Sequence, residues 1–240
     1  MRIILRFCNN SNSISIPQHY NHLVQAAIYS SISPSLSRFL HERGFGYGKR
    51  TFKMFTFSRL LGKHRRQGGR IVFEGDVTLH ISSPVERFIK EITNTIVKRG
   101  SFRIGSSELS VAGLKFPEEP KISREMKIKT LSPITVYSTL FTPDGKKKTY
   151  YYSPYEEEFS ALISKNLMKK FYVLNKREIK SNLHITPERV SECIVMYKDT
   201  IVKGWYGVFS IKGPLSLIKL AYETGLGSKN PEGFGMFEVI

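Results

Sequence analysis

Two side chains in the first 41 residues have the chemistry that proton transfer requires. His41 is the third residue of the stretch FLHE and is followed closely by the glycine-rich GFGYG, which can let a ligand approach the backbone. An imidazole has an ordinary pKa of about 6.5, which suits acid–base work at neutral pH. Tyr29 lies in a segment with helical apolar spacing and falls nearly opposite its apolar stripe. Such a tyrosine either packs under a second domain or faces a substrate.

The spacing of His, Cys, Asp and Glu disfavours a metal site. His19 and His22 have no acidic or cysteine companion, and Cys8 is far from Cys193. The densest acidic run, 156–158, stands where it would complement a helix N-terminus. We therefore expect no metal and no cofactor. A chain of this kind would cut a phosphodiester by acid–base chemistry alone, a route open to RNA because its own 2′-hydroxyl can attack the adjacent phosphate.

Basic residues dominate the charge of the chain. There are 37 Lys and Arg against 20 Asp and Glu, and the net charge of +17 predicts a polyanionic partner, most often nucleic acid. Phe52, Phe55 and Phe57 interleave with one basic stretch, and tyrosines at 150–152 follow another. Aromatic rings stack on unpaired bases while cations neutralise phosphates, as RNA binding requires. The alternative is a solvated basic loop beside core phenylalanines. The candidate RNA-binding cations are Lys49, Arg50, Lys63, Arg65, Arg66 and Arg70, with Lys146, Lys147 and Lys148 in the second stretch.

A glycine-rich stretch, GLGSKNPEGFGMFEVI, covers 225–240. A Walker loop leads from a strand into a helix and contains Gly-Lys followed by Ser or Thr. Here Gly233 is followed by Phe, and the stretch leaves the helical pattern of 215–223 to enter an apolar strand. A mononucleotide site is therefore disfavoured.

The sequence contains neither a secretory signal nor a membrane span. MRIILRFCNN turns polar too soon for a signal peptide, and no run approaches the about 18 apolar residues of a spanning helix. We expect a cytoplasmic protein with reduced cysteines and no membrane partner.

The elements that must position these residues follow the order β-α-β-β-α-β twice, which predicts an α+β fold of two tandem ferredoxin-like (RRM-like) domains. In the first half, strands are expected at 2–8, 52–58, 70–82 (bulged at Gly75) and 108–116, and helices at 20–32 and 84–100. RLLGKHRRQGGR reads as a hairpin loop. The polar segment 116–125 predicts a boundary between domains 1–119 and 120–240. The second half has a predicted hairpin of 126–141 with 146–153, helices at 156–171 and 215–223, and strands at 192–198, 205–213 and 236–240.

Several stretches resemble the CRISPR repeat-processing endoribonucleases, the precursor-crRNA-cutting members of the RAMP superfamily. They are IPQHYNHLVQAAIY, LHE at 40–42, KMFTFS at 53–58, LSPI at 131–134 and, most specifically, GLGSKNPEGFGM at 225–236. The resemblance spans nearly the whole chain and implies a tandem ferredoxin-like fold. It also implies that the glycine loop lies at the RNA-binding face, with Gly225, Gly227, Lys229, Gly233 and Gly235 close to phosphate.

The same resemblance implies a catalytic set of His41, Tyr29 and Lys53. GFGYGKR enlarges the segment before Lys53, so Tyr47 or Lys49 could replace Tyr29 or Lys53. The implied activity is metal-independent cleavage of CRISPR repeat RNA that leaves a 2′,3′-cyclic phosphate and a 5′-hydroxyl. A homodimer or a CRISPR effector complex is the implied assembly. A non-catalytic RNA-binding subunit of such a complex is the alternative, and a general RNA-binding protein is a third reading.

Overall fold

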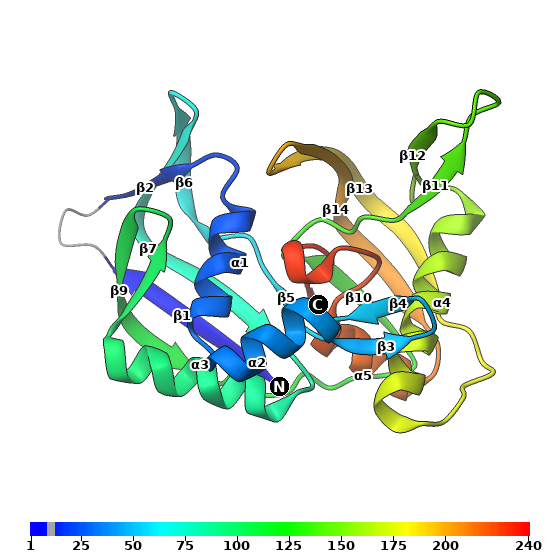
Figure 1. Ribbon diagram of the computed structural model, residues 1–240, viewed down its shortest axis with the longest axis horizontal. Coiled ribbons are helices and arrows are strands. Elements are labelled where there is room, and N and C mark those ends of the chain that lie inside the picture. Colours follow the sequence, from blue (N-terminus) through cyan, green and yellow to red (C-terminus); the bar gives the residue numbers. More distant parts are fainter. Residues whose placement is uncertain (9–12) are drawn as a thin grey trace.

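The computed structural model describes residues 1–8 and 13–240, which form two α+β units side by side (Figure 1). The first sheet uses strands from 2–115 and the second uses strands from 125–239, and the segment 116–124 joins them. Each unit contains an antiparallel sheet with the strand order of a ferredoxin-like fold. The predicted fold class is therefore confirmed. The predicted boundary after residue 119 falls in the joining segment.

The first unit carries the sheet on which the candidate catalytic residues depend. Its elements are β1 (Arg2–Cys8), β2 (Ser13–Pro17), α1 (Asn21–Ser30), α2 (Pro34–Arg38), the π-helix η1 (Phe39–Arg43), β3 (Phe45–Tyr47), β4 (Arg50–Phe52), β5 (Thr56–Phe57), β6 (Leu61–Gln67), β7 (Arg70–Ser82), α3 (Glu86–Arg99), β8 (Ser101–Ile104) and β9 (Ser107–Lys115). The core order is β9-β1-β7, with β5 and β6 on the far side of β7. Gly75 has a φ of +72°, and the register of β6 against β7 shifts nearby, so the predicted bulge is confirmed.

The second unit repeats the plan with an inserted hairpin. Its elements are β10 (Glu125–Thr130), β11 (Tyr137–Phe141), β12 (Lys147–Tyr151), α4 (Glu157–Asn175), β13 (His184–Tyr197), β14 (Thr200–Lys212), α5 (Leu215–Thr224), the 3-10 turn η2 (Asn230–Glu232) and β15 (Phe237–Val239). The sheet order is β13-β14-β10-β15, and β11 pairs only with β12. The expected hairpin of 126–141 with 146–153 is thus shorter than predicted, because the chain leaves the sheet at Thr130 and re-enters strand geometry at Tyr137.

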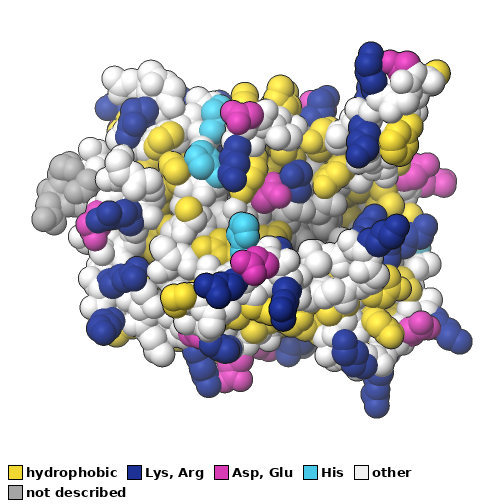
Figure 2. Space-filling model, in the orientation of Figure 1, with side chains coloured by type: hydrophobic (Ala, Val, Ile, Leu, Met, Phe, Trp, Pro, Cys, Tyr) yellow, Lys and Arg dark blue, Asp and Glu magenta, His cyan; other side chains and the backbone are white. Residues whose placement is uncertain are grey.

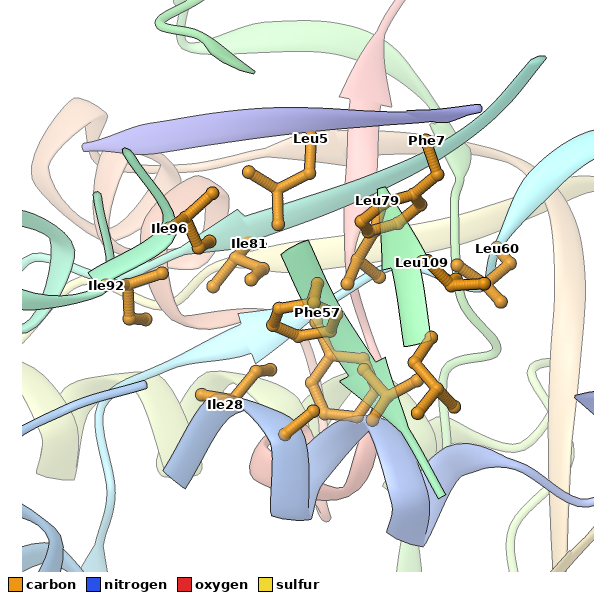
Figure 3. Close-up of a cluster of buried hydrophobic side chains, with 14 of the residues drawn as sticks. Leu5, Phe7, Ile28, Phe57, Leu60, Leu79, Ile81, Ile92, Ile96 and Leu109 are labelled. Atoms are coloured by element: carbon orange, nitrogen blue, oxygen red, sulfur yellow. The ribbon is translucent and has the colours of Figure 1, made fainter. Parts of the chain in front are cut away.

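The first core lies between the sheet and helices α1 and α3. Figure 3 shows Ile28 of α1 and Ile92 and Ile96 of α3 beside Leu5 and Ile81 of the sheet, and all five are buried. The helical spacing of the apolar residues in α3 matches the predicted stripe, and Gly100 ends the helix in the left-handed conformation, as expected. This core fixes α1, the helix that carries Tyr29.

The segment 52–58 differs from its prediction as one half-buried strand. Met54 has a φ of +55°, and the chain leaves strand geometry between β4 and β5. Phe52 and Met54 pack with Val173 of α4, whereas Phe55 belongs to the first core. Because the segment crosses between the two units, both of its sides are covered and its alternating pattern does not produce a half-exposed strand.

Two further elements of the first unit differ from the expectations drawn from the sequence. β8 is not among the predicted strands, because only Phe102 and Ile104 mark it between Gly100 and Gly105; it forms a hairpin with β9. RLLGKHRRQGGR does form a hairpin, but its arms are the paired strands β6 and β7, joined at Gly68 and Gly69. Its arginines therefore stand on a β-ribbon.

Within residues 1–8 and 13–240, no helix is long and apolar enough to cross a bilayer. Over the same residues, no three His, Cys, Asp or Glu side chains gather in a group that could hold a metal ion.

Candidate active site

His41 stands on a short, widened helical turn at the surface. Ser33 precedes α2 and its hydroxyl accepts a hydrogen bond from the Leu36 amide at 3.4 Å, so α2 begins at Pro34 and leads directly into η1. The buried side chain of Leu40 anchors the turn, and the next residue, His41, is exposed. Its imidazole is therefore accessible to a large substrate.

Tyr29 lies beside His41, as the resemblance implies. The centroids of the two rings are 6.1 Å apart, and the Tyr29 ring also meets Phe55 at 5.8 Å. Tyr29 is half-buried against the first core, and burial raises the pKa of its hydroxyl to about 12. The phenol is therefore neutral at physiological pH and can donate a hydrogen bond. The Tyr29 ring packs against the first core, which is neither of the two sequence interpretations, and its contact with a substrate stays a prediction.

Lys53 is the third member of the candidate catalytic group, beside His41 and Tyr29. Its Nζ donates a hydrogen bond to the backbone oxygen of His41 at 2.8 Å, and burial lowers the pKa of its ammonium. Gly44 ends η1 with a φ of +62°, and a Cβ there would lie 2.7 Å from the Phe52 oxygen and 3.3 Å from Lys53 Cδ. A glycine is thus required for Lys53 to cross the end of the turn. The group brings together an imidazole, a phenol and an ammonium, which can move a proton and stabilise an anion.

Tyr47 and Lys49 lie apart from this group. Tyr47 belongs to the β3–β4 hairpin, its ring centroid is 5.6 Å from that of Tyr172 on α4, and Lys169 Nζ lies 5.7 Å from the ring. Lys49 occupies the exposed turn of the same hairpin. The insertion GFGYGKR therefore docks the first unit on α4, and the geometry favours Tyr29 and Lys53 as partners of His41.

A groove of about 710 Å³ runs between the two units on the face shown in Figure 2, where Lys and Arg side chains surround a hollow. Its walls come from the β4–β5 segment, β11, α4 and the glycine loop. Four cations contribute to it: Arg50, Lys53, Lys170 and Lys229. The groove joins the neighbourhood of Lys53 to the glycine loop, and its size and charge suit a polyanionic chain.

The glycines of the 225–240 loop are buried. A Cβ at Gly233 would lie 2.5 Å from the Phe57 ring and 2.8 Å from Asn21 Nδ2, and one at Gly235 would lie 2.0 Å from the Leu226 oxygen. The same holds at Gly225 and Gly227, which face Thr56 and the Thr135 oxygen. These glycines let the loop pack between the two units.

Contact of the glycine loop with phosphate stays a prediction, but three of its glycine amides already have partners within the protein. The amides of Gly225, Gly233 and Gly235 donate to the oxygens of Ala221, Asn230 and Pro133 at 2.8–3.0 Å. They have no donor left for a ligand. Lys229, the predicted cation of the loop, lines the groove, and its Nζ pairs with Glu232 Oε2 at 2.8 Å.

Lys170 and Asn230 organise the loop, and neither was predicted. Lys170 Nζ is buried and donates to Asn230 Oδ1 at 2.7 Å and to oxygens of Thr224 and Gly225 at 3.2–3.4 Å. Asn230 Nδ2 in turn donates to the oxygens of Leu226 and Phe234. Burial lowers the pKa of Lys170 to about 7. The signal in the sequence was the position of Lys170, three residues after Leu167 on the apolar stripe of α4.

Lys63, Arg65, Arg66 and Arg70 lie on the β6–β7 hairpin and Lys146, Lys147 and Lys148 on the β11–β12 hairpin, all outside the groove lining. Lys63 and Arg65 are each 3.7 Å from a Glu74 oxygen, and Arg70 binds Ser15. Arg66 is exposed on the same ribbon, which projects from the first unit (Figure 1). Their contact with RNA stays a prediction.

Two family profiles together cover nearly the whole chain. Residues 15–115 match a profile described as CRISPR-associated protein Cas6, N-terminal, and residues 117–239 match CRISPR associated protein Cas6, C-terminal. The join between the two matches falls between β9 and β10, where the two sheets separate.

Individual relatives are similar over full length. The chain is 32% identical to CRISPR-associated endoribonuclease Cas6 1 of Methanocaldococcus jannaschii, over 98% of this chain and 91% of that protein. The solved structure of a Cas6-related protein from Pyrococcus furiosus superposes with a TM-score of 0.87 at 28% identity, covering 100% of this chain and 98% of the other. A RAMP protein described as binding different RNA substrates superposes with a TM-score of 0.85 at 26% identity, covering 100% and 99%.

Proposed function

The chain belongs to the CRISPR-associated Cas6 family, and from that premise we propose that it binds CRISPR repeat RNA and cuts precursor crRNA without a metal ion. The 2′-hydroxyl before the scissile phosphate loses its proton and attacks phosphorus. The bond to the next nucleotide's 5′-oxygen breaks, and that oxygen takes a proton. The products are a 2′,3′-cyclic phosphate and a 5′-hydroxyl.

The observation that carries this proposal is the meeting of three side chains from separate elements. The rings of His41 and Tyr29 lie 6.1 Å apart, and Lys53 Nζ lies 2.8 Å from the His41 backbone oxygen. His41 accepts the 2′-proton or protonates the leaving 5′-oxygen, since an imidazole exchanges protons near neutral pH. Lys53 stabilises the negative charge that builds on the pentavalent phosphate. Tyr29 orients the substrate by donating a hydrogen bond from a hydroxyl that stays protonated.

RNA reaches this site along the groove. Arg50 and Lys229 line the groove with Lys53, so phosphates can be neutralised along its length. The cations of the β6–β7 hairpin, Lys63, Arg65, Arg66 and Arg70, extend the basic surface of the first unit. The assembly expected from the family, a homodimer or a CRISPR effector complex, is tested by sedimentation of the protein with and without RNA.

The decisive experiment uses end-labelled RNA of the repeat from the source organism's own CRISPR array. Cleavage should persist in excess EDTA, and a single 2′-deoxy substitution before the scissile phosphate should abolish it because the nucleophile is gone. The same deoxy substitution one nucleotide further away is the control and should be cut normally. Cleavage that requires Mg²⁺, or that continues on the deoxy substrate, contradicts the mechanism. Binding without any cleavage would indicate the non-catalytic RNA-binding subunit instead.

A further inference from the structure

Glu232 places a negative charge in a groove whose other charged lining residues are cations. Arg50, Lys53, Lys170 and Lys229 supply positive charge to the lining, and Glu232 shares it with them. A carboxylate beside the phosphates of bound RNA repels them and lowers affinity. Its presence in an RNA groove is explained if it accepts hydrogen bonds from a part of the RNA that donates them. Phosphates and ribose ether oxygens cannot donate, whereas 2′-hydroxyls and base edges can, and of these two donors the base edge alone differs from one nucleotide to the next.

The position of Glu232 is fixed from several sides. Its Oε2 pairs with Lys229 Nζ at 2.8 Å, its amide donates to the Lys229 oxygen at 2.9 Å, and its carbonyl oxygen accepts from Asn21 Nδ2 at 2.8 Å. The carboxylate is nevertheless 24% exposed. Lys229 keeps its side chain in spite of a φ of +57°, the left-handed region that favours glycine. The pair is therefore held rigidly, with carboxylate lone pairs left for a ligand.

An aromatic ring completes this end of the groove. Tyr137, the first residue of β11, lines the groove with Glu232, and Lys229 Nζ lies 5.9 Å from the centroid of its ring. Tyrosine rings serve as stacking platforms for unpaired bases in single-stranded RNA. A base stacked on Tyr137 would lie close to Lys229, the partner of the fixed carboxylate.

Guanine is the standard base that matches a carboxylate on its Watson–Crick edge. Its N1–H and N2–H₂ donors are adjacent and parallel, as the two carboxylate oxygens require. Adenine and cytosine place a ring-nitrogen acceptor beside their amino donor, and uracil flanks its one donor with two acceptors. Resting on the proposed function, we infer that Tyr137, Lys229 and Glu232 form a subsite that reads a guanine of the bound RNA.

The guanine subsite predicts a specific change in base preference for the variant Glu232→Gln. A carboxamide offers one acceptor and one donor group, which fits the N6 amino group and N1 of adenine. It can no longer accept from both N1–H and the N2 amino group of guanine, and it binds guanine only by shifting to O6 and N1–H, so it no longer favours guanine over adenine. The variant also frees Lys229 and makes the groove more basic, so total affinity rises for every RNA. The informative quantity is therefore the ratio of dissociation constants for two RNAs measured on the same protein.

The probes are fluorescein-labelled uridine decamers with one central guanosine, inosine or adenosine, measured by anisotropy at one salt concentration. A uridine decamer can slide until its single purine meets the subsite. Wild-type protein should bind the guanosine decamer about 5- to 150-fold more tightly than the adenosine decamer, the worth of one bidentate base contact. Inosine, which lacks the N2 amino group, should fall between them.

Glu232→Gln should bring the guanosine-to-adenosine preference to about one or reverse it. Glu192→Gln is the matched control, since Glu192 pairs with Lys203 at 3.3 Å outside the groove lining, and it should keep the wild-type preference. Equal wild-type binding of the decamers, or an unchanged preference in Glu232→Gln, overturns the guanine subsite and leaves the proposed nuclease standing. Wild-type protein that binds none of the RNAs overturns both.

Discussion

Burial changes the pKa of two residues at the candidate site, Tyr29 and Lys53. It raises the pKa of Tyr29 to about 12, so this phenol is a donor and a poor base at neutral pH. It lowers the pKa of Lys53, which stays close to the His41 backbone as the nearest cation. His41 is exposed and is the member of the group whose side-chain type exchanges protons near neutrality. These surroundings support the roles that we propose for the three side chains.

Lys170 gives a prediction on stability against pH. Its pKa is lowered to about 7 by burial, whereas an unfolded lysine has a pKa of about 10.4. Between these values the unfolded chain binds more protons than the folded one, so the contribution of Lys170 to stability rises with pH through this window. Lys170→Met removes the contribution.

The measurement is the difference in free energy of unfolding between wild type and Lys170→Met at pH 6, 7.5 and 9. The free energy of unfolding of the wild type should increase relative to that of Lys170→Met as the pH rises. Lys165→Met, on an exposed position of the same helix, is the control and should show no such trend. A difference that is independent of pH would mean that Lys170 is protonated in the folded protein throughout.

The glycine loop, residues 225–240, packs between the two units. Asn21 Nδ2 and Gln25 Nε2 of α1 donate to the oxygens of Glu232 and Pro231 at 2.8 and 2.7 Å, and Thr56 Oγ1 donates to the Phe234 oxygen at 3.0 Å. The loop of the second unit therefore rests directly on the helix that carries Tyr29. This contact makes the relative position of the two units part of the active-site geometry.

Gly233→Ala should destabilise the protein by about 2–4 kcal/mol, combining a crowded Cβ with a left-handed backbone. The Cβ would lie 2.5 Å from the Phe57 ring, and the φ is +86°. Gly48→Ala is the matched control, because Gly48 has a φ of +54° with nothing within 4 Å of the added atom. It should cost only about 1–2 kcal/mol, the backbone part. Equal losses in chemical denaturation would show that the loop has room to relax.

The β6–β7 ribbon gives a prediction on salt dependence. Replacing Arg65 and Arg66 with alanine should shrink the slope of log K against log salt by roughly 1.4, about 0.7 for each single-strand phosphate contact. Stability should change little, because both residues are exposed. The control replaces Lys90 and Lys98, two exposed lysines of α3. If both pairs change the slope alike, the ribbon has no special contact with RNA.

For the molecule as a whole, the apolar pattern predicted most helices and strands of the two ferredoxin-like units but missed β8, and the catalytic residues stay predictions that rest on the resemblance. The apolar stripe of α1 predicted Tyr29 nearly opposite the core, whereas its ring is half-buried against that core, and the resemblance in KMFTFS led to Lys53. The packing partners of the loop glycines could not be predicted, because their spacing reveals where the backbone turns and not what it packs against. Gly233 meets Phe57 and Asn21, partners about 180 and 210 residues away in sequence. Contacts of that range depend on how the two units dock.

The same limit applies to charge. A net charge of +17 predicts a polyanion, yet it does not reveal that Lys170 is buried or that Lys229 is paired with Glu232. The apolar periodicity of α4 predicted a helix and did not show which polar residue its stripe would bury. Lys170 is buried because the loop folds over it, and Lys229 lies in that loop beside Glu232, so both placements are tertiary features.

The measurement that tests the account most directly is the single-turnover cleavage rate of repeat RNA by His41→Ala, with protein in excess over its dissociation constant. The rate should fall by about 10²- to 10⁴-fold, the usual worth of a positioned proton-transfer group, while RNA affinity and melting temperature stay close to those of the wild type. His64→Ala, an exposed histidine of β6, is the control and should cut at the wild-type rate. A His41→Ala variant that cleaves as fast as wild type, or that loses rate only in proportion to lost folding, would contradict the assignment of His41 as the catalytic residue.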